Sequence, residues 1–195
     1  KDVDKILLKK INNSYFNTDG NKENLKFVLE VAKKLKIKKK SVIKTLQKFK
    51  GLKYRQETIF HSKNLTIIND SKATTFSSSV SLLNSLTNVH WIVGGQAKKG
   101  DKLILSKKNC ENFKAYIFGS SKNFFIGKLK KLMKYETFLD LKSLVKKLSL
   151  EIKSDKKTNH KTILFSPSAA SFDNFKNFEK RGEYFNQLIK KYINV

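Results

Sequence analysis

The stretch "KTILFSPSAASFDNFKNFEKRG", residues 161–182, contains the change of pattern that decides the fold of this chain. Its apolar run "TILF" is typical of a buried strand, and a compact loop of small residues follows. Apolar residues then recur at three- and four-residue spacing, which predicts a helix over residues 173–193 that Asp173 opens. A strand, a short loop and a helix in this order form the repeating unit of a parallel sheet.

The same alternation runs back toward residue 51. Two short alternating runs, "QETIFH" and "NLTIIND", flank "SKN" and predict a hairpin. The remaining elements are strands in "VHWIVGG", "AYIFGSS" and "KYETFL" and helices in "TTFSSSVSLLNSL", "KNFFIGKLKKLM" and, opened by Asp140, "DLKSLVKKLSLEIK". We therefore expect an α/β domain with a mostly parallel sheet and helices on both faces.

The first fifty residues follow a different pattern. Residues 1–18 contain two strand-like pieces, "KILLKKI" and "SYFNT", and a helical pattern begins at Asn21. The stretch "KKKSVIKTLQKF" predicts a second helix with Ser41 as its N-cap. Gly51 then interrupts the pattern. We place a domain boundary near residue 50, which divides the chain into residues 1–50 and 51–195.

Composition limits the kind of protein further. Of the 195 residues, 39% are hydrophobic, so the chain is globular rather than disordered. No apolar run approaches the roughly 20 residues of a membrane span. The single cysteine, Cys110, excludes an internal disulfide and favours a reducing compartment. We expect a cytoplasmic protein without a membrane partner.

The net charge of +26 is what a nucleic-acid-binding protein could carry. The 42 basic residues, however, include only two arginines, Arg55 and Arg181, and therefore 40 lysines. Nucleic-acid surfaces usually include arginine, whose planar fork binds phosphates and bases bidentately. The lysines are also spread through every segment. We therefore expect no nucleic-acid partner.

Small and polar residues follow the predicted parallel strands. "NDSKATT" follows "LTII", "GGQAKKGD" follows "WIV", "GSSK" follows "YIF", and "SPSAASFDNF" follows "ILF". Ligands of such sheets bind beyond the carboxyl ends of the strands, where these loops converge. Taken singly, each loop also fits a turn, a tight strand exit or a helix cap. The phosphate-binding patterns GxxxxGK[ST] and GxGxxG are both missing from the sequence, and the three histidines lack metal-ligand spacing.

Taken together, these loops resemble a known family. "GLKYR", "NDSKAT", "GGQAKKGD" and "SPSAASFDNFKNFEKRG", in this order and spacing, resemble the Mur ligases, most closely those that add D-glutamate. The upstream "GNKENLKFVLEVAKKL" resembles a helix at the end of their central ATPase domain. The resemblance covers essentially the whole chain. It implies a Rossmann-like C-terminal Mur ligase domain over residues 51–195, preceded by the C-terminal tail of the central ATPase domain over residues 1–50.

The resemblance also implies a reaction. Such a ligase phosphorylates the carboxylate of UDP-N-acetylmuramoyl-L-alanine with ATP and Mg²⁺, and the amine of D-glutamate attacks the acyl phosphate. Lys72 is implied as the catalytic cation, since charge builds up on the phosphates and on the oxyanion. The residues implied for ATP are Asn21, Asn24, Arg55, Asp70 and Lys72. Those implied for D-glutamate are Thr74, Lys98, Ser171 and the backbone near Phe178.

The resemblance places the UDP-binding domain, the phosphate loop and the magnesium ligands outside this sequence. We expect a monomeric cytoplasmic enzyme, no metal ligand within this chain, and no activity from this chain alone. The sequence departs from the family pattern at Gly20, at Tyr54 and at Gln96–Ala97, positions that concern nucleotide contacts and loop shape.

Two alternatives remain open. One is a basic, non-catalytic binding module on an α/β scaffold. The other is a different Mur or folylpolyglutamate-type ligase. The D-N-P-R pattern of the meso-diaminopimelate-adding ligase does not occur in the sequence, and folylpolyglutamate synthases do not share "SFDNFKNFEKRG".

Overall fold

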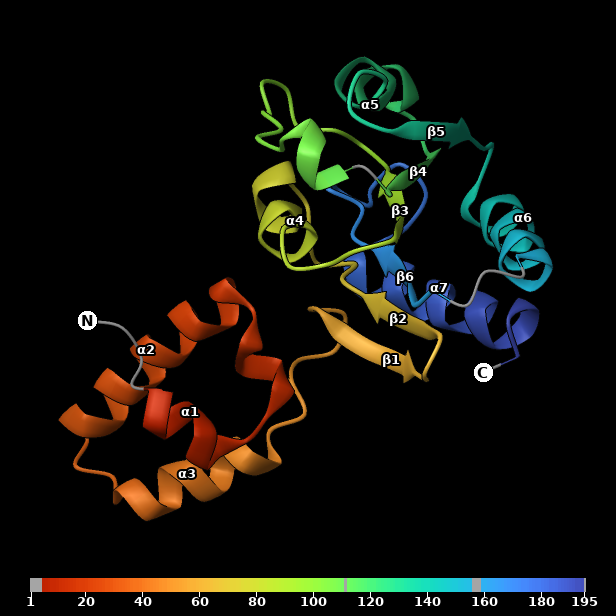
Figure 1. The fold of residues 1–195 in the computed structure, drawn as a ribbon. Coiled ribbons are helices and arrows are strands. Elements are labelled where there is room, and N and C mark those ends of the chain that lie inside the picture. Colours follow the sequence, from red (N-terminus) through yellow and green to blue (C-terminus); the bar gives the residue numbers. More distant parts are fainter. Residues whose placement is uncertain (1–4, 111, 156–158, 195) are drawn as a thin grey trace. The chain divides into compact units, whose positions relative to one another are not determined.

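The chain forms two compact units that divide between Gly51 and Leu52. The structure is a computed structural model and describes residues 5–110, 112–155 and 159–194 (Figure 1). Among these residues, no helix is both long and apolar enough to cross a membrane. The two units are described separately below.

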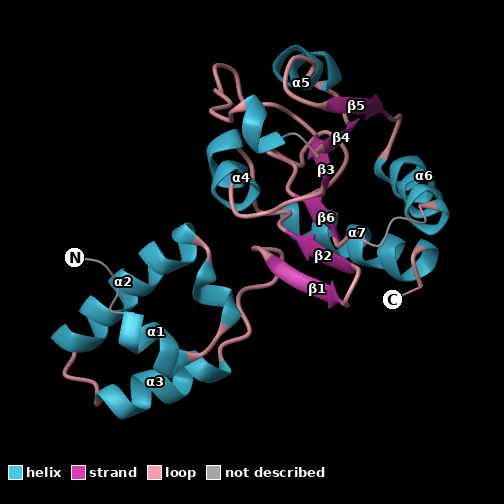
Figure 2. Ribbon diagram, in the orientation of Figure 1, coloured by secondary structure: helices cyan, strands magenta, loops and turns pink. Residues whose placement is uncertain are grey.

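The first unit is entirely helical. Its elements are α1 (Lys5–Ile11), the 3-10 helix η1 (Ser14–Asn17), α2 (Asp19–Lys34) and α3 (Lys39–Lys48) (Figure 2). A small core of Ile11, Phe16, Leu25 and Leu46 holds these elements together. The Asn13 amide adds a polar tie, because its Nδ2 donates to the carbonyl oxygens of Leu46 (2.8 Å) and Phe49 (2.7 Å).

Two predictions for this unit were wrong. The strands predicted within residues 1–18 are helical over Lys5–Ile11 and Ser14–Asn17, and residues 1–4 lie outside the described residues. The apolar Leu7 and Leu8 lie four and three residues before Ile11, so a helix turns them toward one core. Ser41 is not an N-cap: α3 begins two residues before it, after Lys38.

The second unit contains one six-stranded sheet in the order β1-β2-β6-β3-β4-β5. The strands are β1 (Glu57–His61), β2 (Leu65–Asn69), β3 (Val89–Gly94), β4 (Lys114–Phe118), β5 (Lys134–Thr137) and β6 (Lys161–Phe165). β1 and β2 form the predicted antiparallel hairpin, and every other neighbouring pair is parallel. The mostly parallel sheet is therefore confirmed.

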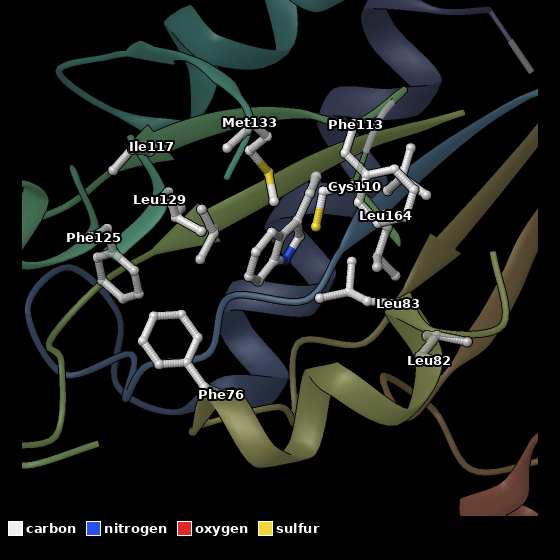
Figure 3. Close-up of a cluster of buried hydrophobic side chains, with 14 of the residues drawn as sticks. Phe76, Leu82, Leu83, Cys110, Phe113, Ile117, Phe125, Leu129, Met133 and Leu164 are labelled. Atoms are coloured by element: carbon white, nitrogen blue, oxygen red, sulfur yellow. The ribbon is translucent and has the colours of Figure 1, made fainter. Parts of the chain in front are cut away.

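Helices cover both faces of this sheet. They are α4 (Phe76–Leu83), α5 (Lys122–Leu129), α6 (Leu141–Ser154) and α7 (Phe178–Tyr192), with the 3-10 helix η2 at Lys107–Cys110. One core joins α4 and α5 to the sheet through Phe76, Leu83 and Phe125 (Figure 3). A second core joins α6 and α7 to the opposite face through Leu148 and Phe185. The α/β fold class is confirmed.

The last helix begins later than predicted. α7 starts at Phe178, and its N-cap is Asn177, whose Oδ1 accepts a hydrogen bond from the Lys180 amide (2.8 Å). Asp173 instead lies in the turn before the helix and accepts a hydrogen bond from the Ser120 amide (3.0 Å). The prediction that Asp173 opens the helix was wrong, because this carboxylate caps a neighbouring loop.

Candidate functional site

The loops that follow β2, β3, β4 and β6 are hydrogen-bonded to one another at one edge of the sheet. The Gly94 amide donates to Pro167 O (2.9 Å), and the Gly95 amide donates to Phe118 O (3.2 Å). Gln96 and Ala170 exchange two backbone hydrogen bonds of 3.0 Å each. Hydrogen bonds therefore join these loops at one edge, as expected for the carboxyl ends of parallel strands.

Gly95 allows the loops to come this close. Its φ of +126° is a conformation that residues with a side chain rarely adopt. A Cβ at this position would lie 2.6 Å from the carbonyl oxygen of Ala170. Gly95, which directly follows β3, thus serves the close packing of loops.

Asp70 follows β2 and is buried. One carboxylate oxygen accepts a hydrogen bond from the Gln56 amide (3.1 Å), and the other accepts from Ser166 Oγ (2.8 Å). Ser79 Oγ then contacts the hydroxyls of both Ser166 and Ser168. Burial raises the pKa of Asp70 to about 7, although these hydrogen bonds and the nearby Arg55 oppose the shift.

Lys72 and Phe178 lie against each other. The Lys72 ammonium is 4.1 Å from the centroid of the Phe178 ring, a cation–π contact. The Lys72 amide donates to Tyr54 O (3.0 Å), so the loop after β2 also binds the start of this unit. Two residues predicted for different ligands, ATP and D-glutamate, are therefore neighbours.

An aspartate connects the loops that carry Thr74 and Lys98. Asp101 Oδ2 accepts a hydrogen bond from the Phe76 amide at the start of α4 (2.7 Å). The Asp101 amide donates to the carbonyl oxygen of Lys98 (3.2 Å). Ser171 is buried directly after Ala170, which pairs with Gln96. Thr74, Lys98 and Ser171 thus lie on three loops that hydrogen bonds hold together.

Comparison with known proteins supports the family resemblance, although no family model matches the chain. It is 38% identical over 177 residues to the UDP-N-acetylmuramoylalanine–D-glutamate ligase of a Wolbachia from Brugia malayi, covering 90% of this chain and 35% of the relative. The Wolbachia pipientis ligase of the same name is 34% identical, with 96% and 38% covered. The chain belongs to the Mur ligase family.

Solved structures agree with this Mur ligase fold. The Thermotoga maritima MurF ligase in complex with ADP is 18% identical, with a TM-score of 0.58, and 91% of this chain and 39% of that chain are covered. Acinetobacter baumannii MurF gives a TM-score of 0.62 at 13% identity, with 91% and 38% covered. At this identity the likeness concerns the fold alone. The chain spans about two fifths of the length of the Mur ligases it matches.

Asn21 and Asn24, the remaining predicted residues, lie on α2 of the first unit. Asn21 is buried, and its Nδ2 donates to the carbonyl oxygen of Tyr15 (2.7 Å). Asn24 is exposed one turn further along the helix. Their role toward a nucleotide stays a prediction, as does the assignment of this unit to the tail of the central ATPase domain.

Sequence reasoning missed how three residues organise the edge in this Mur ligase chain: it gave no role to Asp101 or Arg181, and it gave Asp173 only the start of a helix. Asp101 and Asp173 each accept a backbone amide from a neighbouring loop. Arg181 is fully buried and donates to two of the loops. One signal was available: a chain with 40 lysines keeps arginine at only two positions, and both belong to the motifs quoted above.

The described residues include no group of three or more His, Cys, Asp or Glu side chains arranged to hold a metal ion. The carboxyl groups of Asp70, Asp101 and Asp173 at this edge each accept hydrogen bonds from the protein itself. The cations on the same loops suit phosphate and carboxylate oxygens.

Proposed function

We propose that this chain is the C-terminal portion of an ATP-dependent ligase that adds D-glutamate to UDP-N-acetylmuramoyl-L-alanine in peptidoglycan biosynthesis. The names of its relatives support the substrate, and the likeness to Mur ligase structures supports the fold. The observation that carries the proposal is the edge of the sheet. There, Lys72, Thr74, Lys98 and Ser171 lie on loops that bind one another, as a site for two anionic ligands requires.

We assign the nucleotide half of the site to Arg55, Asp70 and Lys72. Arg55 is exposed, and its charge opposes the rise that burial causes in the pKa of Asp70, so a cation is available for phosphate oxygens near this carboxylate. Asp70 would accept hydrogen bonds from the ribose hydroxyls, since each carboxylate oxygen can accept a second donor. Lys72 would neutralise charge on the phosphoryl group during transfer, which is the step that a fixed cation accelerates.

We assign the amino-acid half to Thr74, Lys98, Ser171 and the backbone amide of Phe178. D-glutamate carries two carboxylates, which require cations and hydrogen-bond donors. The Lys98 ammonium is exposed, whereas the buried Ser171 offers a hydroxyl inside the loop cluster. The amides at the start of α7 add the positive end of a helix dipole. Asn177 already occupies one of them, the Lys180 amide.

The rest of the ligase completes the reaction in this proposal. The first unit is the tail of the central ATPase domain, and Asn21 and Asn24 are its proposed nucleotide-binding residues. The phosphate loop and the Mg²⁺ ligands lie outside this chain, so the chain alone neither hydrolyses ATP nor forms an amide. We place the complete monomeric enzyme in the cytoplasm, with no nucleic-acid or membrane partner.

The experiment is steady-state kinetics of the full-length ligase that carries this chain. Lys98→Ala and Ser171→Ala should each raise the KM for D-glutamate roughly ten- to hundred-fold, because each removes a hydrogen bond to a carboxylate. The KM for ATP should change little. Lys99→Ala is the matched control, since Lys99 is an adjacent exposed lysine without an assigned ligand.

Three outcomes would count against the proposal. If D-glutamate does not stimulate phosphate release by the wild-type ligase while another amino acid does, the substrate is misassigned. If no amino acid does, the alternative of a basic binding module gains support. Unchanged KM values in both variants would remove Lys98 and Ser171 from the site.

A further inference from the structure

Arg181 lies in the first turn of α7 and has no solvent-exposed surface. A guanidinium is costly to remove from water unless its donors are satisfied. Burial lowers the pKa of Arg181 to about 10, and the nearby carboxylates of Asp173 and Asp70 oppose this shift. The fold therefore keeps a charged group inside the loop cluster, and its contacts show what it holds.

The guanidinium binds two of the loops directly. Its Nε donates to Ser71 Oγ (3.1 Å), and its Nη2 donates to the carbonyl oxygens of Ser71 (2.7 Å) and Ala169 (3.0 Å). Ser71 Oγ in turn donates to the carbonyl oxygen of Phe178 (2.8 Å). One side chain thus joins the loop after β2, the loop after β6 and the start of α7.

The third nitrogen points toward a further loop. Nη1 is buried and has no hydrogen-bond partner among the described residues. It lies 3.1 Å from the position that a Cβ at Gly95 would occupy, so it is next to the loop after β3. A buried donor without an acceptor is unfavourable, and such groups are rare in native structures. Nη1 can therefore donate one further hydrogen bond, at the place where the loops after β2, β3 and β6 meet.

We propose that Arg181 is a positioning residue that couples the nucleotide-binding loop to the amino-acid-binding loops. The inference rests on the proposed function. Ser71 immediately precedes Lys72, Ala169 is two residues from Ser171, and Gly95 is three residues from Lys98. Movement of one loop when its ligand binds is therefore transmitted through the guanidinium to the others. The unused Nη1 provides a hydrogen bond that the loops can form as they tighten around the ligands.

Gly182, the next residue after Arg181, also helps to connect α7 to the loop after β2. Gly182 carries no side chain, and the Tyr54 ring fills the space that a Cβ there would need. Tyr54 O accepts the Lys72 amide (3.0 Å), so α7 also supports the Lys72 loop through this ring. Asn69 adds a third connection, because its Nδ2 donates to Gly182 O (2.9 Å) and to Asn186 Oδ1 (2.7 Å).

Only arginine fits this position. Its planar fork directs donors to Ser71 and Ala169 at the same time, whereas an ammonium is a point charge on a flexible stem. Arg181→Lys should consequently keep the positive charge but lose the simultaneous hydrogen bonds to Ser71 and Ala169. A purely structural role would allow this variant to fold with normal ligand affinities.

The first test uses the full-length ligase. We expect Arg181→Lys to raise the KM values for ATP and D-glutamate together, each roughly ten-fold. Leu188→Ala is the matched control, because it weakens the packing of α7 in the core without touching the loops, and it should leave both KM values unchanged. An Arg181→Lys enzyme with both values unchanged, or with only one raised, overturns the proposal.

The second test does not depend on the reaction. Hydrogen exchange is measured on the 195-residue chain for the amides of Lys72, Gly94, Gln96 and Ala170, which are bonded between loops. In Arg181→Lys all four should exchange faster, roughly ten-fold, while the amides of α7 stay protected. If these amides exchange in Arg181→Lys at the wild-type rates, the proposal is overturned, whichever amino acid the ligase uses as its substrate. If Arg181→Lys does not fold, Ser71→Ala removes the acceptor of Nε and should show a smaller change in the same direction.

Discussion

Asp70 is the residue whose environment differs most from what its position in the sequence suggests. A motif aspartate after a strand is usually taken to be ionised, yet this one is buried among hydroxyls and has a pKa of about 7. Between about pH 4 and 7 the folded chain holds a proton that the unfolded chain has lost, so the free energy of unfolding falls as the pH rises through this window. Ionisation of Asp70 thus lowers the stability of the folded chain, and ligand binding can offset this loss.

We therefore predict that Asp70→Asn stabilises the second unit at pH 8 by roughly 1–3 kcal/mol and has little effect at pH 4, where Asp70 is protonated. Trp91 is the single tryptophan, is fully buried and reports on this unit alone. Urea unfolding followed by its fluorescence at pH 4, 6 and 8 measures the difference. A variant that is no more stable than wild type at pH 8 would show that the carboxyl group is already ionised without cost.

A second prediction at this scale concerns Lys72. Lys72→Ala in the full-length ligase should lower kcat about 100-fold, because the ammonium acts mainly when the phosphoryl group transfers. Asp70→Ala should chiefly raise the KM for ATP. The rate of phosphate release, measured over a range of ATP concentrations up to saturation, gives both kcat and the KM for ATP, with Lys53→Ala, an exposed lysine, as the control. Normal kcat in Lys72→Ala would exclude Lys72 from the chemical step.

At the scale of elements, two helices begin with the same kind of cap but in different settings. The α6 cap is local, because Asp140 Oδ1 accepts the Ser143 amide (2.7 Å). The α4 cap is long-range. Thr75 makes no side-chain cap bond, and the Phe76 amide instead donates to Asp101, which lies in the loop after β3. The helix that follows Thr74 is thereby tied to the loop that carries Lys98.

We predict that Asp101→Ala and Asp140→Ala each lower the free energy of unfolding by about 1 kcal/mol, the usual value of an N-cap. Only Asp101→Ala should also raise the KM for D-glutamate in the full-length ligase, since it alone loosens the Lys98 loop. The pair separates lost stability from lost positioning. Equal KM values in the two variants would show that the α4 cap has no part in the site.

At the scale of the whole molecule, each unit has its own core, and the two differ in size. The core of the first unit is a single cluster of four buried residues, whereas the second unit has a core on each face of its sheet. A domain of about 50 residues is marginal because it buries too little surface. We expect the first unit to unfold before the second.

Leu25→Ala tests this expectation. It removes a fully buried side chain of the first unit and should destabilise that unit by about 2–5 kcal/mol. The midpoint of the Trp91 fluorescence transition should stay unchanged while helical circular dichroism is lost. Leu148→Ala, in the core of the second unit, should instead lower the Trp91 midpoint. A shift of the Trp91 midpoint in Leu25→Ala would show that the units unfold together.

The sequence by itself determined the elements of the second unit and their layering. Alternating runs identified the β1–β2 hairpin, and apolar spacing identified α6 with its cap Asp140, because these signals lie within a few residues of one another. The same local signals misled at α1, where the apolar residues of "KILLKKI" fit a strand or a helix equally well. They also misled at Asp173, whose partner is the distant Ser120 amide.

Only the tertiary structure decided how the site is held together. Nothing near Arg181 in sequence indicates that it binds Ser71, 110 residues away, or that its Nη1 lies beside Gly95. The bond from Phe76 to Asp101 likewise depends on the loops after β2 and β3 meeting at one edge. Local patterns specify which segments become strands and helices. Long-range contacts decide which loops meet, because the insertion of β6 between β2 and β3 brings together residues that are far apart in the chain.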